Sequence, residues 1–108
     1  IVTNLVMNSI HHAYDPDEAG QLRLQFEQDR EQLMLIYSDD GRGISPDHLK
    51  KIFEPFFTTA RQQGGSGLGL HLVYNLVTRK LQGSIQCESE PGQGTTFIIK
   101  LPLTVADE

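Results

Sequence analysis

The chain has 108 residues, the size of one small domain. Nine Lys and Arg residues against fourteen Asp and Glu residues give a formal charge of −5, which argues against a nucleic-acid-binding surface. The single cysteine, Cys87, excludes an internal disulfide framework and a cysteine-based zinc site. No apolar run reaches the roughly 18 residues that would span a bilayer.

The first half of the chain predicts a helix followed by two strands. Residues 1–14 have helical spacing but no capping residue before Ile1, so we expect a helix already under way and a chain truncated at its N-terminus. Residues 21–28 alternate apolar and polar side chains, which predicts a half-buried strand. A second strand is expected over residues 32–38, and the polar turn between the two makes the pair antiparallel.

The second half predicts two helices and another pair of strands. Ser45-Pro46-Asp47 is typical of a helix start, because Ser caps, Pro suits the first position and Asp suits the dipole. The expected elements are a short helix ending near Ile52, a loop over 58–67, a long helix over 69–81 with Gly83 as its cap, and strands over 84–89 and 95–101. Such an order predicts a two-layer α/β sandwich with the helices on one face, followed by a tail over 104–108.

The first helix carries one polar stripe on an otherwise apolar surface. Asn4, Asn8, His11 and His12 recur at helical spacing, so they share one face. A helix so apolar is mostly buried, and an unsatisfied buried polar group costs about 1–3 kcal/mol. A hydrated metal or a phosphate would satisfy these side chains, and a solvated polar face is an equal alternative.

Two glycine motifs follow at positions that suit a ligand. Asp39-Asp40-Gly41-Arg42-Gly43 comes directly after a strand, where a carboxylate can accept a hydrogen bond from an exocyclic amine; a plain turn is the alternative. The run from Gly64 to Leu70 opens the long helix, and backbone amides at such a terminus form an anion site. It lacks the Lys-Ser/Thr of a phosphate-binding P-loop. The aromatic run from Phe53 to Phe57 suits a hinge or an anchor beside the loop.

These motifs, in this order, resemble the ATP-binding catalytic domain of sensor histidine kinases, within the Bergerat-fold ATPases. Residues 4–9 look like the N box of that family, residues 39–43 like its first glycine box, residues 53–57 like its F box and residues 65–70 like its second glycine box. Residues 92–97 resemble its C-terminal glycine–threonine–phenylalanine segment. The resemblance covers residues 1–103 and implies a mostly antiparallel, mixed sheet.

The resemblance implies ATP and Mg²⁺ as cofactors and assigns roles to particular residues. Asn8 would bind the metal, Asp39 would accept from the adenine amino group, and residues 58–64 would form the lid over ATP. Thr96, on the strand behind the pocket, would support Asp39. The remaining nucleotide-binding positions implied are Gly41, Gly43, Ile44, Phe57, Gly65, Ser66, Gly67, Leu68, Gly69 and Leu70.

Two departures bear on the chemistry. Family members that hydrolyse ATP carry a glutamate four residues before the metal asparagine, and Asn4 stands there. An amide cannot act as a general base, so the resemblance favours transfer of the γ-phosphoryl group to a protein histidine. His11 stands where many members have Lys or Arg, and it is a candidate phosphate donor. The expected catalytic set is therefore Asn8, Asn4 and His11.

The resemblance also implies partners. The phospho-acceptor histidine would lie on an upstream dimerisation domain of a homodimeric parent, and the phosphate would pass to the receiver domain of a response regulator. The domain would be cytoplasmic, with no direct membrane or nucleic-acid contact, and its parent could be anchored in a membrane. Two alternatives stay open: a non-catalytic nucleotide-binding regulatory module and a Bergerat ATPase that hydrolyses ATP.

Overall fold

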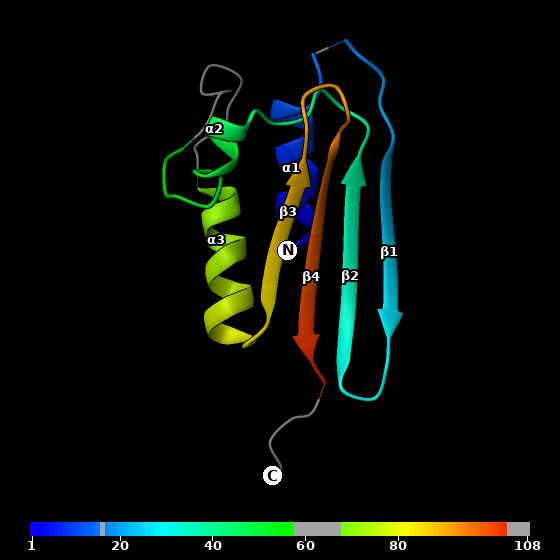
Figure 1. The fold of residues 1–108 in the computed structure, drawn as a ribbon, viewed down its shortest axis with the longest axis vertical. Coiled ribbons are helices and arrows are strands. Elements are labelled where there is room, and N and C mark those ends of the chain that lie inside the picture. Colours follow the sequence, from blue (N-terminus) through cyan, green and yellow to red (C-terminus); the bar gives the residue numbers. More distant parts are fainter. Residues whose placement is uncertain (16, 58–67, 104–108) are drawn as a thin grey trace.

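The computed structural model of the chain describes residues 1–15, 17–57 and 68–103. One layer of the domain is a four-stranded sheet in the order β1-β2-β4-β3 (Figure 1). The strands are β1 (Leu22–Gln28), β2 (Gln32–Asp39), β3 (Ser84–Ser89) and β4 (Thr95–Pro102). The pairings β1–β2, β2–β4 and β3–β4 are all antiparallel, so the described sheet has no parallel pair.

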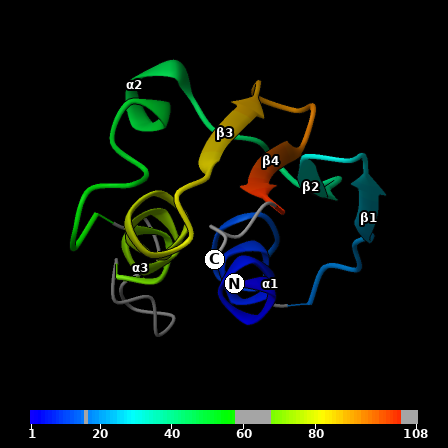
Figure 2. The same cartoon turned by 90° about the horizontal axis from the view of Figure 1, so that it is seen from below.

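The helices form a second layer on one face of this sheet. They are α1 (Val2–His12), the short α2 (Pro46–Leu49) and α3 (Gly69–Asn75), which continues as the π-helical turn η2 (Leu76–Lys80). Figure 2 shows α1 and α3 side by side on the same face of the sheet, and Figure 1 shows α2 beyond the start of α3. This arrangement confirms the two-layer α/β sandwich. No helix in the described residues is long and apolar enough to cross a membrane.

The core lies between the two layers. Alternate residues of β2 and β4 point toward the helices, and Leu35, Tyr37, Phe97 and Ile99 are buried there. Leu5 of α1, Val73 of α3 and Val77 of η2 close the core from the helical side. The two central strands therefore supply the sheet side of the core.

Strand β1 differs from the prediction of half burial. All seven of its residues are exposed, and Leu22, Leu24 and Phe26 remain 41%, 41% and 61% accessible. The apolar alternation correctly marked the face that looks toward the helical layer, since Phe26 pairs with the buried Leu35. In Figure 2, however, α1 packs over the central strands and leaves β1 outside its cover.

The ends of two helices also differ from expectation. Helix α2 ends at Leu49 and continues as turns, rather than reaching Ile52. The helix that begins at Gly69 ends at Lys80, but the left-handed residue after it is Gln82, with a φ of 57°. Gly83 instead passes against β4, where an added Cβ would lie 2.1 Å from the carbonyl oxygen of Lys100. The N–H of Gly83 still closes the helix by donating to the carbonyl of Val77 at 2.7 Å, but close packing explains why the residue is a glycine.

Candidate functional site

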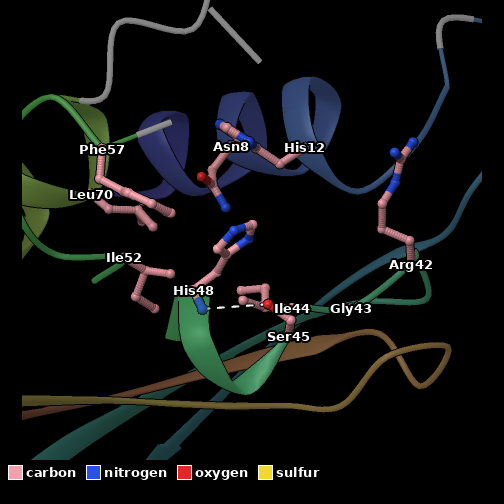
Figure 3. A pocket seen from close by; sticks show the side chains of 10 residues that line it. All are labelled: Asn8, His12, Arg42, Gly43, Ile44, Ser45, His48, Ile52, Phe57 and Leu70. Carbon is pink, nitrogen blue, oxygen red and sulfur yellow. Dashed lines mark hydrogen bonds between the residues drawn. The ribbon is translucent and has the colours of Figure 1, made fainter. Parts of the chain in front are cut away.

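A cavity of about 320 Å³ opens between α1, α2 and the start of α3 (Figure 3). This volume lies in the range of small-molecule sites. Helix α1 provides one wall, the segment after β2 and helix α2 provide the opposite wall, and α3 closes one end. The lining residues are Asn8, His12, Arg42, Gly43, Ile44, Ser45, His48, Ile52, Phe57 and Leu70.

The two walls present polar groups to each other across an otherwise apolar space. In Figure 3 the carboxamide of Asn8 points from α1 into the cavity, toward His48 of α2. The His48 ring lies edge-on to Phe57, with the centroids 5.3 Å apart and the planes at 65°. Helix α2 is held by Ser45, whose hydroxyl accepts a hydrogen bond from the backbone N–H of His48 at 3.4 Å. The cavity therefore offers polar groups from Asn8 and His48 beside an apolar lining of Ile44, Ile52, Phe57 and Leu70.

Hydrogen bonds hold the segment between β2 and α2 to the end of α1 on one side and to β3 and the β3–β4 turn on the other. The N–H of Arg42 donates to the carbonyl of Ala13 at the end of α1, at 3.0 Å. The carbonyl of Arg42 accepts from the N–H of Gly92, in the β3–β4 turn, at 2.8 Å. The N–H of Ile44 donates to Oγ of Ser89 at 2.8 Å. These bonds give the wall that faces Asn8 a fixed backbone shape.

Contacts within the chain account for both glycines of this segment. An added Cβ on Gly41 would lie 2.4 Å from the Cβ of Ala13. Gly43 has a φ of 77°, and a Cβ there would lie 2.1 Å from the carbonyl oxygen of Glu90. Gly41 therefore makes room for the end of α1, while Gly43 makes room for the β3–β4 turn and also lines the cavity. The expected role of both glycines beside a nucleotide stays a prediction.

Asp39 lies at the end of β2, behind the residues that line the cavity. Its side chain is buried, and its two carboxylate oxygens each accept a hydrogen bond. Oδ2 accepts from the hydroxyl of Ser9 at 2.8 Å, and Oδ1 accepts from the N–H of Gly41 at 3.0 Å. Ser9 follows Asn8 on α1, so the buried carboxylate and the carboxamide in the cavity are linked through adjacent residues.

Arg42 and His12 provide two of the polar groups that line the cavity. Burial lowers the pKa of His12 below its usual 6.5, and the charges of His11 and Arg42 lower it further. His12 is therefore mostly neutral near pH 7 and can donate or accept a hydrogen bond. Arg42 forms an exposed ion pair with Asp15 at 2.8 Å. Surface pairs of this kind contribute little stability, so the guanidinium remains available to an anion.

The donor set of the cavity fits a metal that the ligand itself helps to hold. In the described ranges, no group of three His, Cys, Asp or Glu side chains is arranged to hold a metal ion. Asn8 offers one carboxamide oxygen. Mg²⁺ commonly takes one or two protein ligands and completes its shell with water and phosphate oxygens. The residues present therefore fit Mg²⁺ bound with a phosphorylated ligand, with Asn8 as the protein ligand.

The structure brings together several of the residues expected from the sequence. Asn8, Gly43, Ile44, Phe57 and Leu70 all line the cavity. Leu68 immediately precedes α3, and Gly69 is the first residue of that helix. The lid expected over 58–64, and Gly65, Ser66 and Gly67, lie outside the described residues.

Besides Asp39, Gly41, Leu68 and Gly69, three more expected residues that the structure describes are not among those that line the cavity. His11 is not among the lining residues, whereas His12, one turn after Asn8, is. Asn4 lies beside the start of α3, where its Oδ1 is 3.9 Å from the position a Cβ would take on Gly69. Thr96 pairs with Ser38 and therefore occupies the face of the sheet opposite Asp39. Its neighbour Thr95 pairs with Asp39 and is buried beside it.

Sequence reasoning did not select Arg42, Ser45, His48 or Ile52 as lining residues. Each had a signal of its own. Arg42 lies inside the first glycine motif, and Ser45 and His48 belong to the helix start that was recognised only as a cap. Ile52 is the apolar residue just before the aromatic run. Spacing alone did not show that these residues face α1.

Comparison with known proteins places this arrangement in a family. Residues 1–105 match the family described as histidine kinase-, DNA gyrase B-, and HSP90-like ATPase. The chain is 43% identical to the autoinducer 2 sensor kinase/phosphatase LuxQ of Vibrio parahaemolyticus, covering 95% of the chain and 13% of LuxQ. It is 35% identical to the alginate biosynthesis sensor protein KinB of Pseudomonas aeruginosa, covering 95% of the chain and 17% of KinB.

Solved structures agree with the sequence relatives. The catalytic domain of the histidine kinase ThkA, in a nucleotide-free form, matches with a TM-score of 0.74 and 31% identity, over 92% of this chain and 62% of that one. The full-length kinase ShkA in complex with AMPPNP matches with a TM-score of 0.77 and 28% identity, over 99% of this chain and 21% of that one. The chain therefore belongs to the histidine kinase-, DNA gyrase B- and HSP90-like ATPase family, as an ATP-binding catalytic domain of the sensor histidine kinase type.

Proposed function

We propose that the cavity binds Mg·ATP and that the domain presents the γ-phosphoryl group to a histidine on another domain of its parent protein. The observation that carries this proposal is the link between Asn8 and Asp39: a carboxamide in the cavity and a buried acceptor behind it, joined through Ser9. A carboxylate in that position suits the adenine amino group, and Asn8 would hold the Mg²⁺ ion, which would offset negative charge on the phosphates.

Transfer of this kind needs little covalent chemistry from the protein. The attacking histidine nitrogen forms a bond to the γ-phosphorus while the bond to the ADP leaving oxygen breaks, with the two in line. The domain's part is to hold the nucleotide in position and, through the bound metal, to offset the charge on the phosphates. Asn4 supports transfer over hydrolysis, because its amide cannot take a proton from water.

The partners belong to this proposal as well. The chain spans 13% and 17% of the lengths of LuxQ and KinB, so it corresponds to one part of such proteins. We place the acceptor histidine on a dimerisation domain, in a homodimeric parent whose catalytic domains face the cytoplasm. The phosphate would then pass to an aspartate on the receiver domain of a response regulator.

A thermal melt tests the nucleotide part of the proposal. At 100 times the dissociation constant, Mg·ATP should add about 2.7 kcal/mol to the unfolding free energy. Each kcal/mol raises the melting temperature of a domain this size by roughly 4–8 °C. Asp39→Asn should lose this rise, since its amide no longer offers two acceptors. Asp40→Asn is the matched control, because the Asp40 carboxylate faces Tyr14 and Gln21 rather than Ser9.

Phosphoryl transfer is tested in the full-length parent. With ATP labelled at the γ-position, we expect label to appear on a histidine of the parent and to be lost in Asn8→Asp. If the melt of the wild-type chain did not respond to Mg·ATP, or if Asp39→Asn responded as strongly as wild type, the assignment of the cavity would be wrong. A melting temperature that rises with nucleotide, together with no label on the parent, would instead support the alternative of a non-catalytic regulatory module.

A further inference from the structure

We propose that Tyr37 and Ser9 form a hydroxyl relay that fixes Asp39 as a hydrogen-bond acceptor, and that this relay makes the site prefer a 6-aminopurine to a 6-oxopurine. The inference rests on the proposed function, because it assigns base selectivity to the same cavity. Neither hydroxyl was selected from the sequence. Both residues act as positioning residues, since they reach the ligand only through Asp39.

The relay joins the helical layer to the sheet. Tyr37 and Asp39 are two residues apart on β2 and therefore point to the same face, toward α1. Oγ of Ser9 lies 2.9 Å from the hydroxyl oxygen of Tyr37 and 2.8 Å from Oδ2 of Asp39. Ser9 is 0% exposed and Tyr37 is 2% exposed, so bulk water does not compete for these bonds.

The number of protons fixes the direction of the relay. Ser9 has one hydroxyl proton and donates it to Asp39. In its contact with Tyr37 it must therefore accept, and the phenol must donate. Burial raises the pKa of the Tyr37 phenol, so this end of the relay keeps its proton at neutral pH. The order is Tyr37 O–H to Ser9 Oγ, then Ser9 O–H to Asp39 Oδ2.

The reverse direction is unfavourable in this site. A protonated Asp39 could donate to Ser9, and Ser9 to Tyr37, but the phenol proton would then need another acceptor. Within the described residues, Ser9 is the hydrogen-bond partner of the Tyr37 hydroxyl. A buried donor left without a partner costs about 1–3 kcal/mol. Tyr37 thus holds the relay in the direction that leaves Asp39 as an acceptor.

Base selectivity follows from this direction. Oδ1 of Asp39 also accepts from the N–H of Gly41, at 3.0 Å, so the protein supplies a donor to each carboxylate oxygen. The lone pairs that remain can accept from a ligand amine. A 6-oxo group would bring a second acceptor against the carboxylate. Sites that pair a buried polar group with a ligand hydrogen bond reject analogues that cannot form it.

The test compares ATP with inosine triphosphate, which differs at the 6-position and keeps the same phosphates. The double variant Ser9→Ala/Tyr37→Phe removes both hydroxyls together and leaves neither unpaired. We expect the ratio of the dissociation constants for inosine triphosphate and ATP, measured by calorimetry, to fall at least about tenfold in this variant. Tyr37→Phe alone, which keeps the bond from Ser9 to Asp39, should lower the ratio by less.

Tyr14→Phe is the matched control, because it also removes a phenol bonded to a carboxylate, that of the neighbouring Asp40. It should leave the ratio unchanged even if it lowers the melting temperature. A double variant that folds, as judged by circular dichroism, and keeps the wild-type ratio would overturn the inference. If the double variant does not fold, an unchanged ratio in Tyr37→Phe would overturn it.

The outcomes separate this inference from the proposed function. A wild-type chain that binds ATP, together with relay variants that keep its preference for ATP, contradicts the relay alone. A wild-type chain that binds neither nucleotide contradicts both the proposed function and the relay. A fall in melting temperature without a change in the ratio would show that the two hydroxyls only stabilise the fold.

Discussion

The phenol of Tyr14 donates a 2.5 Å hydrogen bond to Oδ1 of Asp40, and the same oxygen accepts from the N–H of Gln21 at 2.9 Å. The bond joins the end of α1 to the end of β2. Burial, followed by the hydrogen bond to Asp40, raises the pKa of Tyr14 to about 12. The N–H of Gln21 and the phenol lower the pKa of the Asp40 carboxyl. The two adjacent carboxylates thus make different contacts: Asp40 bonds to Tyr14 at the end of α1, and Asp39 bonds to Ser9 within α1.

Tyr14→Phe should destabilise the domain below pH 10 and have less effect above it. The folded phenol has a raised pKa, so its contribution is fully present below the unfolded value near 10 and is lost as the pH rises toward 12. We expect the difference in unfolding free energy between wild type and Tyr14→Phe to shrink from pH 8 to pH 11. Urea denaturation followed by circular dichroism measures it. A difference that stayed constant would mean that the phenol contributes through packing alone.

Gly43→Ala should be far more harmful than Gly92→Ala. Both glycines have left-handed backbones, with φ values of 77° and 81°. A Cβ on Gly92 would meet nothing within 4 Å, so that variant measures the backbone cost alone, about 1–2 kcal/mol. A Cβ on Gly43 would in addition clash with the carbonyl oxygen of Glu90, at a distance of 2.1 Å. Chemical denaturation of both variants gives the comparison, and equal losses of stability would contradict the steric argument.

The sequence was informative wherever one local rule decided the outcome. Alternation identified β2 and the shared face of Leu35 and Tyr37, and the Ser-Pro-Asp start identified α2. The order of the motifs also predicted that Asn8 and Leu70 belong to one site. For β2 and α2 the spacing within one segment was sufficient, because a helix or a strand fixes which of its own residues share a face. Only the family resemblance joined Asn8 and Leu70, which lie on different helices.

What the sequence did not show are the relations between segments. Alternation in β1 shows which residues share a face, but not whether a helix covers that face. The choice between Thr95 and Thr96 depends on the register of β4 against β2. The choice between His11 and His12 depends on how α1 is rotated over the sheet. Ser9 and Tyr37 are 28 residues apart, and no local pattern indicates that their hydroxyls meet.

Cys87 should make the domain sensitive to alkali and resistant to thiol reagents. Burial, with a smaller effect from the charges of Asp39 and Glu88, raises the pKa of its thiol from 9.0 to about 12. Its contribution is therefore present below pH 9 and lost as the pH rises toward 12. We expect wild type to lose more stability than Cys87→Ala between pH 8 and pH 11.

The same pKa governs the reactivity of the thiol. A thiolate is the reactive form, so labelling of the folded chain at pH 8 by a disulfide reagent should be at least about tenfold slower than labelling of the urea-unfolded chain. Equal labelling rates would show that the thiol is not held in its protonated form by the fold.

Hydrolysis of ATP should be slow in this chain and faster in Asn4→Glu. Asn4 lies one turn before Asn8 on α1 and beside the start of α3, so a carboxylate there could take a proton from water near the phosphates. A positioned general base contributes about 10²–10⁴-fold to such reactions. Release of inorganic phosphate measures turnover, and Asn4→Gln is the control, because it has the length of Glu without its basicity. If wild type or Asn4→Gln released phosphate as fast as Asn4→Glu, the absence of a base at this position would not explain slow hydrolysis.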